Sequence, residues 1–229
     1  MGIKALFLSL ALVAFGFKAS AETECQEAVG FIGVMKNCQA SVTIVVSKRN
    51  RKSVDAGSGF IVYIDQLDNV AYIVTNAHVV VSKYVRNYLV RYVNSIGNYQ
   101  VNKAELINLD IQSDLALLRV SGDFLAEVSL GNSASLKLNS PIYSISSPGF
   151  IENNSFLHGH FIGRSKNSEL RKEISALFLS LPNAPGASGG GIYDQSGLLI
   201  GVVRAIMAVD GTPFTPLTYA IAVEKVNDF

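Results

Sequence analysis

Residues 41–80 read SVTIVVSKRNRKSVDAGSGFIVYIDQLDNVAYIVTNAHVV, and this stretch contains three short runs rich in β-branched and aromatic residues. The runs are SVTIVV, GFIVYI and AYIVT, and charged residues, Gly, Asp and Asn separate them. Such side chains favour extended strands, whereas the separating residues favour turns. The stretch therefore predicts three consecutive β-strands with short connections.

The same pattern continues through the rest of the chain. Further runs of this kind are YLVRYV, LALLRV, PIYSISS, FLHGHFIG, ISALFLSL and LLIGVVRAI. No amphipathic segment between them is long enough for a crossover helix, which disfavours a parallel α/β sheet and favours a barrel or sandwich. The sequence thus predicts an all-β protein, with helix confined to short pieces at 79–86 and 224–229.

The composition is that of a folded globular protein, because 49% of the 229 residues are hydrophobic and only 16% are charged. The formal net charge of +1 indicates neither a nucleic acid nor an anionic membrane as a partner. The segment 125–139 is richer in Ser, Asn and Gly, where two β units of similar size would join. We therefore expect two barrels, at about 41–125 and 135–229.

Residues 1–21 have the features of a signal peptide. Lys4 supplies a positive charge, 5–17 are apolar, and 19–21 are small residues at the expected cleavage site before Glu22. The alternative is an uncleaved membrane anchor, but the apolar stretch is shorter than the roughly 20 residues that span a bilayer. We expect a secreted or periplasmic protein with no stable membrane span after cleavage.

Export would place the two cysteines in an oxidising compartment. Cys25 and Cys38 both lie in the N-terminal segment 22–40, and an oxidising compartment favours their pairing in one disulfide. So short a closed loop would stabilise the fold by roughly 3 kcal/mol. The histidines are His78 and the pair in FLHGHFIG, His158 and His160, which we interpret as structural. Without a CxxC pair the chain lacks a zinc-binding pattern, and we expect no metal.

The string PGASGGG at 185–191 lies between two apolar runs and suits a serine nucleophile. Glycines in a tight turn would let the hydroxyl of Ser188 project while the amides of Gly186 and Ser188 converge on a substrate oxygen. A glycine-rich hairpin loop is the alternative.

Candidates for a general base and for the carboxylate that orients it are also present. His78 follows the apolar run AYIVT, and Asp114 directly precedes the apolar run LALLRV, where we expect it to be buried. Each of the two could also be an ordinary structural residue. The order His, Asp, Ser along the chain joins these separate signals.

In that order and context the chain resembles the trypsin-like serine proteases, in particular their bacterial HtrA/Deg branch. The resemblance covers about 41–229. The matching strings are GSGFIV (57–62), TNAHVV (75–80), SDLALLRV (113–120), LGNSASLKLNSPIYSISSPGF (130–150), PGASGG (185–190), LLIGVV (198–203) and TYAIAV (218–223).

The resemblance implies two six-stranded antiparallel β-barrels, a short C-terminal helix, and a serine endopeptidase acting on protein or peptide substrates without a cofactor. His78 would take the proton of Ser188, Asp114 would orient His78, and Ser188 would form the acyl-enzyme. The amides of Gly186 and Ser188 would form the oxyanion hole.

The resemblance also places a substrate pocket before the serine and along the following strand. Since no acidic residue stands there, we do not expect a preference for Lys or Arg before the cleaved bond. Arg204 suggests a preference for acidic substrates, and the alternative is an outward-facing residue on the strand. The expected pocket residues are Leu181, Pro182, Asn183, Val203 and Arg204.

Two features depart from the family pattern. Ala187 stands where Asn or Asp is usual, which argues against activation through a freed N-terminus, and the chain stops at Phe229 without the PDZ module that is typical of HtrA proteases. Because Ala187 is unusual and one fold can serve several functions, a catalytically inactive barrel acting as a binding or regulatory module is the alternative function. An oligomer is possible, because HtrA proteases often form trimers through N-terminal segments, but the sequence predicts no particular oligomeric state.

Overall fold

The structure is a computed structural model that describes residues 30–48, 54–81, 85–147, 154–165, 176–209 and 212–229. The predicted signal peptide, its cleavage site and Cys25 lie outside these ranges. Within the described ranges, no helix is long and apolar enough to span a membrane.

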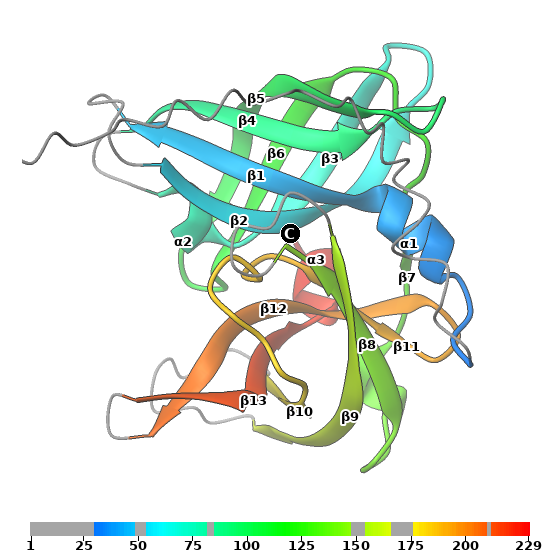
Figure 1. Ribbon diagram of the computed structural model, residues 1–229, viewed down its shortest axis with the longest axis vertical. Coiled ribbons are helices and arrows are strands. Elements are labelled where there is room, and N and C mark those ends of the chain that lie inside the picture. The colour runs from blue at the N-terminus through cyan, green and yellow to red at the C-terminus, as the bar shows by residue number, and fades with distance from the viewer. Residues whose placement is uncertain (1–29, 49–53, 82–84, 148–153, 166–175, 210–211) are drawn as a thin grey trace, which may run out of the picture.

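Six antiparallel strands close into a first barrel, in the order β1-β2-β3-β6-β5-β4 (Figure 1). Branched and aromatic side chains fill its interior, among them Ile44, Ile73 and Leu118. The strands are β1 (Ser41–Lys48), β2 (Val54–Asp65), β3 (Val70–Thr75), β4 (Val85–Val93), β5 (Tyr99–Asp110) and β6 (Leu115–Ser121).

A second sheet has the order β11-β8-β9-β10-β13-β12-β7, and β11 also pairs with β12. That pairing closes six antiparallel strands into a second barrel, while β7 adds two residues parallel to β12. The strands are β7 (Ser129–Leu130), β8 (Pro141–Ser146), β9 (Ser155–Ser165), β10 (Ala176–Ser180), β11 (Gly191–Asp194), β12 (Leu198–Val209) and β13 (Thr212–Ala222). The prediction of two six-stranded antiparallel barrels is confirmed.

The described helices are short. They are α1 (Val34–Ala40), α2 (Ala77–Val80), a 3-10 turn η1 (Ser133–Ser135) and α3 (Glu224–Asn227). The predicted C-terminal helix is confirmed as α3. The helix near the histidine begins at Ala77, before the predicted start at 79, so His78 lies within it.

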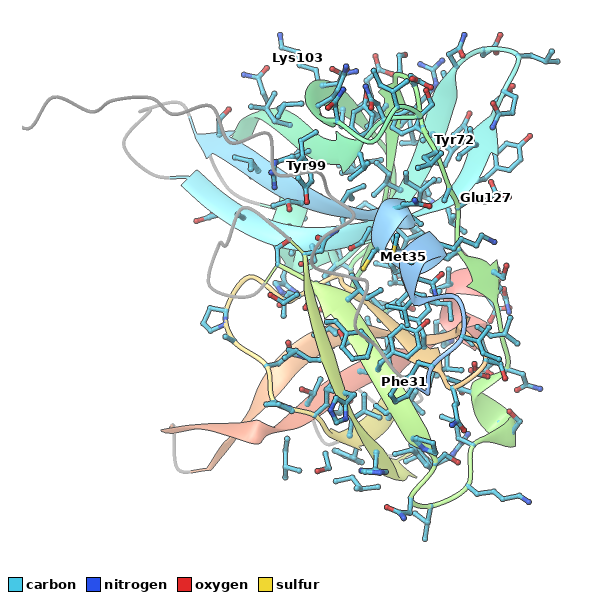
Figure 2. The ribbon with its side chains drawn as sticks, turned by 45° about the vertical axis from the view of Figure 1, so that its right-hand side comes forward. Phe31, Met35, Tyr72, Tyr99, Lys103 and Glu127 are labelled. Carbon is cyan, nitrogen blue, oxygen red and sulfur yellow. The ribbon has the colours of Figure 1, made fainter. Side chains whose placement is uncertain are left out.

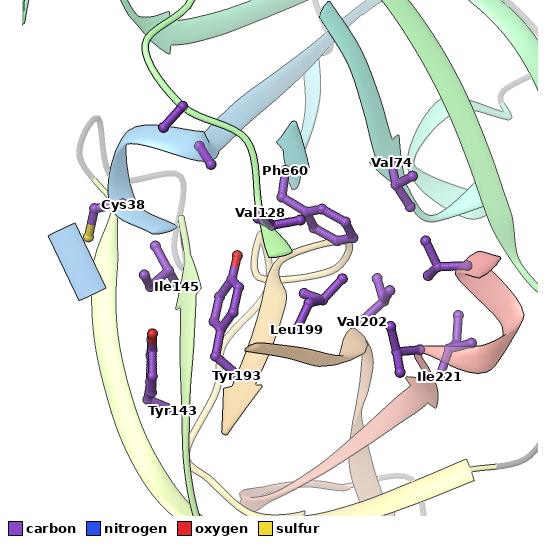
Figure 3. Packing of buried hydrophobic residues seen from close by; sticks show 14 of the residues in the cluster. Cys38, Phe60, Val74, Val128, Tyr143, Ile145, Tyr193, Leu199, Val202 and Ile221 are labelled. Atoms are coloured by element: carbon purple, nitrogen blue, oxygen red, sulfur yellow. The ribbon is translucent and has the colours of Figure 1, made fainter. Parts of the chain in front are cut away.

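An apolar cluster joins the two barrels (Figure 3). Phe60 and Val74 from the first barrel pack with Tyr193, Leu199 and Ile221 from the second. The same cluster includes buried residues of α1 and α3. Apolar burial of this kind resists relative motion of the barrels, so groups on the two sides of the junction keep their spacing.

The N-terminal segment before β1 docks on the second barrel. Nδ2 of Asn37 donates to Oη of Tyr143 and to the carbonyl oxygen of Gly197, each at 2.9 Å, and Tyr143 Oη donates to the carbonyl oxygen of Ile32 at 3.1 Å. Burial raises the pKa of Tyr143 to about 12. The ring of Phe31 packs edge-on against that of Tyr143, and Figure 2 shows Phe31 beside the second barrel. The segment thereby extends the core of that barrel.

Cys38 lies in this docked segment, on α1, and is buried. Because Cys25 lies outside the described residues, the disulfide between them stays a prediction.

Candidate active site

The loop between β10 and β11 forms a tight turn around Ser188. Gly186 and Gly189 have φ angles of 97° and 88°, a backbone region that favours glycine. The amide of Gly190 donates to the carbonyl oxygen of Ala187 at 3.0 Å and closes the turn. Ser188 lies at its tip and is half-buried.

Ser58 of β2 fixes this loop to the first barrel. Its amide donates to the carbonyl oxygen of Ser188 at 2.8 Å, and its Oγ donates to that of Gly186 at 2.8 Å. Ser58 Oγ in turn accepts from the amide of Ser147 at 2.8 Å, and Thr75 Oγ1 donates to the Ser58 carbonyl oxygen at 2.7 Å. Ser58 was not among the predicted site residues, although it lies in the matching string GSGFIV.

His78 and Asp114 form a directly bonded pair. His78 lies on α2, directly after β3, and its side chain is 48% exposed; Asp114 lies in the turn before β6, and its side chain is 9% exposed. His78 Nδ1 is 2.9 Å from Oδ2 and 3.1 Å from Oδ1 of Asp114, and the His78 amide donates to Oδ1 at 3.0 Å. An ionised carboxylate only accepts hydrogen bonds, so Nδ1 carries the proton and Nε2 is left as an acceptor.

The environment of Asp114 keeps its carboxyl ionised. Burial by itself would raise the pKa of Asp114, but the hydrogen bonds and charge of His78, together with the hydrogen bond from Arg204, outweigh it. The pKa of Asp114 therefore lies below its ordinary value.

Arg204 of β12 connects Ser188 to this pair. Ser188 Oγ donates to the carbonyl oxygen of Arg204 at 3.2 Å, and Arg204 Nε donates to Oδ2 of Asp114 at 3.0 Å. Within the described part of the chain, Ser188 Oγ makes no hydrogen bond with His78. Such bonds are often long or misaligned before substrate binds. The three predicted triad residues thus fall in one hydrogen-bonded group, with Arg204 between Ser188 and Asp114.

The two predicted oxyanion donors, the amides of Gly186 and Ser188, belong to the same loop as the Ser188 hydroxyl. Among the described residues, the amides of Gly186 and Ser188 make no backbone hydrogen bond. Their role as oxyanion donors stays a prediction.

The five predicted pocket residues lie in different surroundings. Leu181 and Val203 are buried in the core of the second barrel, Pro182 is exposed, and Arg204 is directed at Asp114. Asn183 is buried and donates to Thr218 Oγ1 at 3.2 Å. None of the five lines the two cavities beside α3, whose walls include Val226 in one and Lys225 in the other. A pocket formed by them stays a prediction.

The remaining histidines lie away from this group. His158 and His160 are exposed on β9, and the His158 ring lies 6.1 Å from those of Phe31 and Phe156. No group of three metal-ligating side chains occurs among the described residues.

Two barrels joined at a site with a serine in a glycine turn and a bonded His–Asp pair define the class of trypsin-like peptidases. A family model described as "Trypsin-like peptidase domain" matches residues 57–202, and the chain belongs to this family. The predicted resemblance is confirmed.

Within that class the similar proteins are of the DegP and HtrA type. The chain is 32% identical over 181 residues to a "Probable periplasmic serine endoprotease DegP-like" of Pseudomonas fluorescens, and 34% identical over 182 residues to a protein of the same name from Pseudomonas fulva. Each match covers 79% of this chain and 35% of the relative. The chain thus spans about a third of the length of the curated relatives it matches.

Solved structures of this type share the fold. "HtrA-type protease AlgW with tripeptide" superimposes with a TM-score of 0.71 at 22% identity, covering 86% of this chain and 60% of that one. The serine endoprotease from Yersinia pestis superimposes with a TM-score of 0.66 at 20% identity, covering 86% and 63%. At these identities the likeness shows the fold alone.

Proposed function

We propose that the chain is the catalytic domain of a serine endopeptidase that hydrolyses peptide bonds in protein or peptide substrates. The carrying observation is the hydrogen-bonded group in which Nδ1 of His78 is bound to Asp114 while Ser188 stands at the tip of a glycine turn. The relatives named serine endoproteases support the same reaction.

The first half of the reaction acylates the serine. The Ser188 hydroxyl turns from the Arg204 carbonyl oxygen to Nε2 of His78, which takes its proton as Oγ attacks the carbonyl carbon of the substrate. The protonated His78 gives this proton to the leaving nitrogen as the peptide bond breaks, and an acyl-enzyme remains.

The second half returns the free serine. Water attacks the acyl carbon, His78 takes one proton of that water, and the same proton goes back to Ser188 Oγ as the ester bond breaks. Asp114 remains ionised throughout and holds the imidazole in the tautomer that leaves Nε2 free.

The amides of Gly186 and Ser188 would stabilise the negative oxygen that forms during each attack. Loss of one such donor lowers the rate of comparable enzymes by about a hundredfold to a thousandfold.

The setting of this enzyme completes the proposal. Residues 1–21 would direct export and 41–229 would form the protease domain, in keeping with relatives whose names call them periplasmic. The disulfide between Cys25 and Cys38 would tie the N-terminal segment 22–40 to itself. Substrate side chains would be selected near Leu181–Asn183 and along the strand around Val203 and Arg204. The proposal holds for a monomer and for an oligomer.

A fluorophosphonate probe, which reacts only with a base-activated serine, tests the proposal. We expect the folded protein from Glu22 onward to be labelled, and Ser188→Ala and His78→Ala to lose the label. Ser196→Ala, at an exposed serine in the β11–β12 turn, serves as the matched control and should label like the wild type. A folded wild type that takes up no probe would instead favour the binding module.

A further inference from the structure

Arg204 occupies an irregular position in β12. In the ladder between β12 and β13, Val203 pairs with Ala220 and Ala205 pairs with Tyr219, so Arg204 is an extra residue without a partner on β13. Such a bulge redirects the side chain of the extra residue and increases the local twist. Here it leaves the Arg204 carbonyl oxygen to Ser188 and directs the guanidinium across to Asp114.

The guanidinium is held on two sides. Its Nε donates to Asp114 Oδ2 at 3.0 Å, and its Cζ lies 5.5 Å from the ring centre of Tyr219. The Arg204 side chain is 15% exposed and that of Asp114 is 9% exposed, so both charges are largely removed from water. A charged hydrogen bond with little exposure restrains both partners.

The bond changes the charge balance of the His–Asp pair. While His78 is neutral, a buried Asp114 carboxylate would face no positive charge without Arg204. The described side chains that lower the pKa of Asp114 are His78 from α2 and Arg204 from β12. The ring of Tyr219 from β13 faces the guanidinium of Arg204. Asp110, at the end of β5, is instead bonded to the amide of Ser113.

Arg204 also acts on His78 through space. Oδ2 of Asp114 lies 3.0 Å from Arg204 Nε and 2.9 Å from His78 Nδ1, so the two nitrogens are at most about 6 Å apart. A fixed positive charge at that distance opposes the gain of a second proton by the imidazole. Because only the neutral imidazole can act as a base, the cation keeps the base available in more acidic solution.

We propose that Arg204 is a positioning residue of the triad, which orients the Asp114 carboxylate toward His78 and extends the activity to lower pH through its positive charge. The inference rests on the proposed function. It gives Arg204 a role inside the reacting group, distinct from selection of an acidic substrate.

The test is the rate constant of fluorophosphonate labelling as a function of pH. Arg204→Gln keeps a hydrogen-bond donor but loses the charge. Its acid limb should move to higher pH by about 0.5–1 unit, as expected for unit charges about 6 Å apart in a partly wet site. Arg204→Lys keeps the charge but loses the planar donor, so its acid limb should stay while the plateau rate falls by about tenfold. Arg119→Gln is the matched control, since it removes an arginine paired with Glu105 on the surface, and it should change neither quantity.

The outcomes separate the two proposals. An unchanged acid limb in folded Arg204→Gln would overturn the role of Arg204 while leaving the serine endopeptidase intact. A wild type without labelling would overturn both. Circular dichroism melting checks the folding of each variant, and if Arg204→Gln does not fold, an unchanged plateau in Arg204→Lys overturns the positioning role.

Discussion

Ser58→Ala removes one hydroxyl from the contact between the first barrel and the serine loop. Ser58 Oγ donates to the carbonyl oxygen of Gly186 and accepts from the amide of Ser147, and Ser58 is fully buried. The substitution leaves both backbone groups without that partner in a place that water does not reach. The backbone around the predicted oxyanion hole would then be less restrained.

The expected loss follows from these two groups. Leaving a buried polar group unsatisfied costs about 1–3 kcal/mol, so the free energy of unfolding should fall by about 3 kcal/mol. For a domain of this size, that corresponds to a melting temperature about 6–12 °C lower. The rate of fluorophosphonate labelling at 25 °C should fall by about tenfold or more, since the backbone of the serine loop is no longer held at the Gly186 carbonyl group.

Thermal melting and labelling of the same preparation measure both effects. Ser144→Ala is the control, because Ser144 is also fully buried but its Oγ has no hydrogen-bond partner. That variant should melt at or above the wild-type temperature. If Ser58→Ala melts and labels like Ser144→Ala, the Ser58 hydroxyl does not hold the loop, and the reasoning is refuted.

Two further predictions concern the loop and the carboxylate. Gly189→Ala should abolish labelling and lower the free energy of unfolding by more than about 3 kcal/mol, because φ is 88° and a Cβ would collide with the Ser58 carbonyl oxygen; Gly163→Ala, with open space around it, should melt like the wild type. The pKa of Asp114 is lower in the folded protein than its ordinary value of 3.8, so the ionised carboxylate stabilises the fold. This contribution is fully present above pH 3.8 and is lost as the pH falls through the lower folded pKa. The melting temperature should therefore drop below about pH 4, and Asp114→Asn should make that drop smaller; an equal drop in both proteins would argue against a stabilising carboxylate.

Most strands could be predicted because a strand whose side chains fill a barrel core needs a run of branched or aromatic residues. Runs such as AYIVT in β3 and LALLRV in β6 carry branched side chains toward the core, and such runs are visible in the sequence. β5 (Tyr99–Asp110) was missed, because most of its residues are exposed or only half-buried and its sequence YQVNKAELINLD is largely polar. β11 (Gly191–Asp194) was missed because four residues are too few for a pattern.

The triad candidates could be named for a related reason. A serine in a tight turn requires glycines beside it, and two of them have positive φ angles here. Asp114 directly precedes the buried strand β6. Both features can be recognised from neighbouring residues in the sequence. The resemblance of seven strings then joined the candidates into one family, which the family match confirms.

The sequence alone therefore determined most of the strands, the family and the three candidate triad residues. Only the tertiary structure decided that Ser58 holds Gly186 and that Arg204 faces Asp114, since these pairs are 128 and 90 residues apart. Neither contact has a local pattern. The first depends on the packing of one barrel against the other, and the second depends on a bulge in β12 that turns one arginine toward the junction.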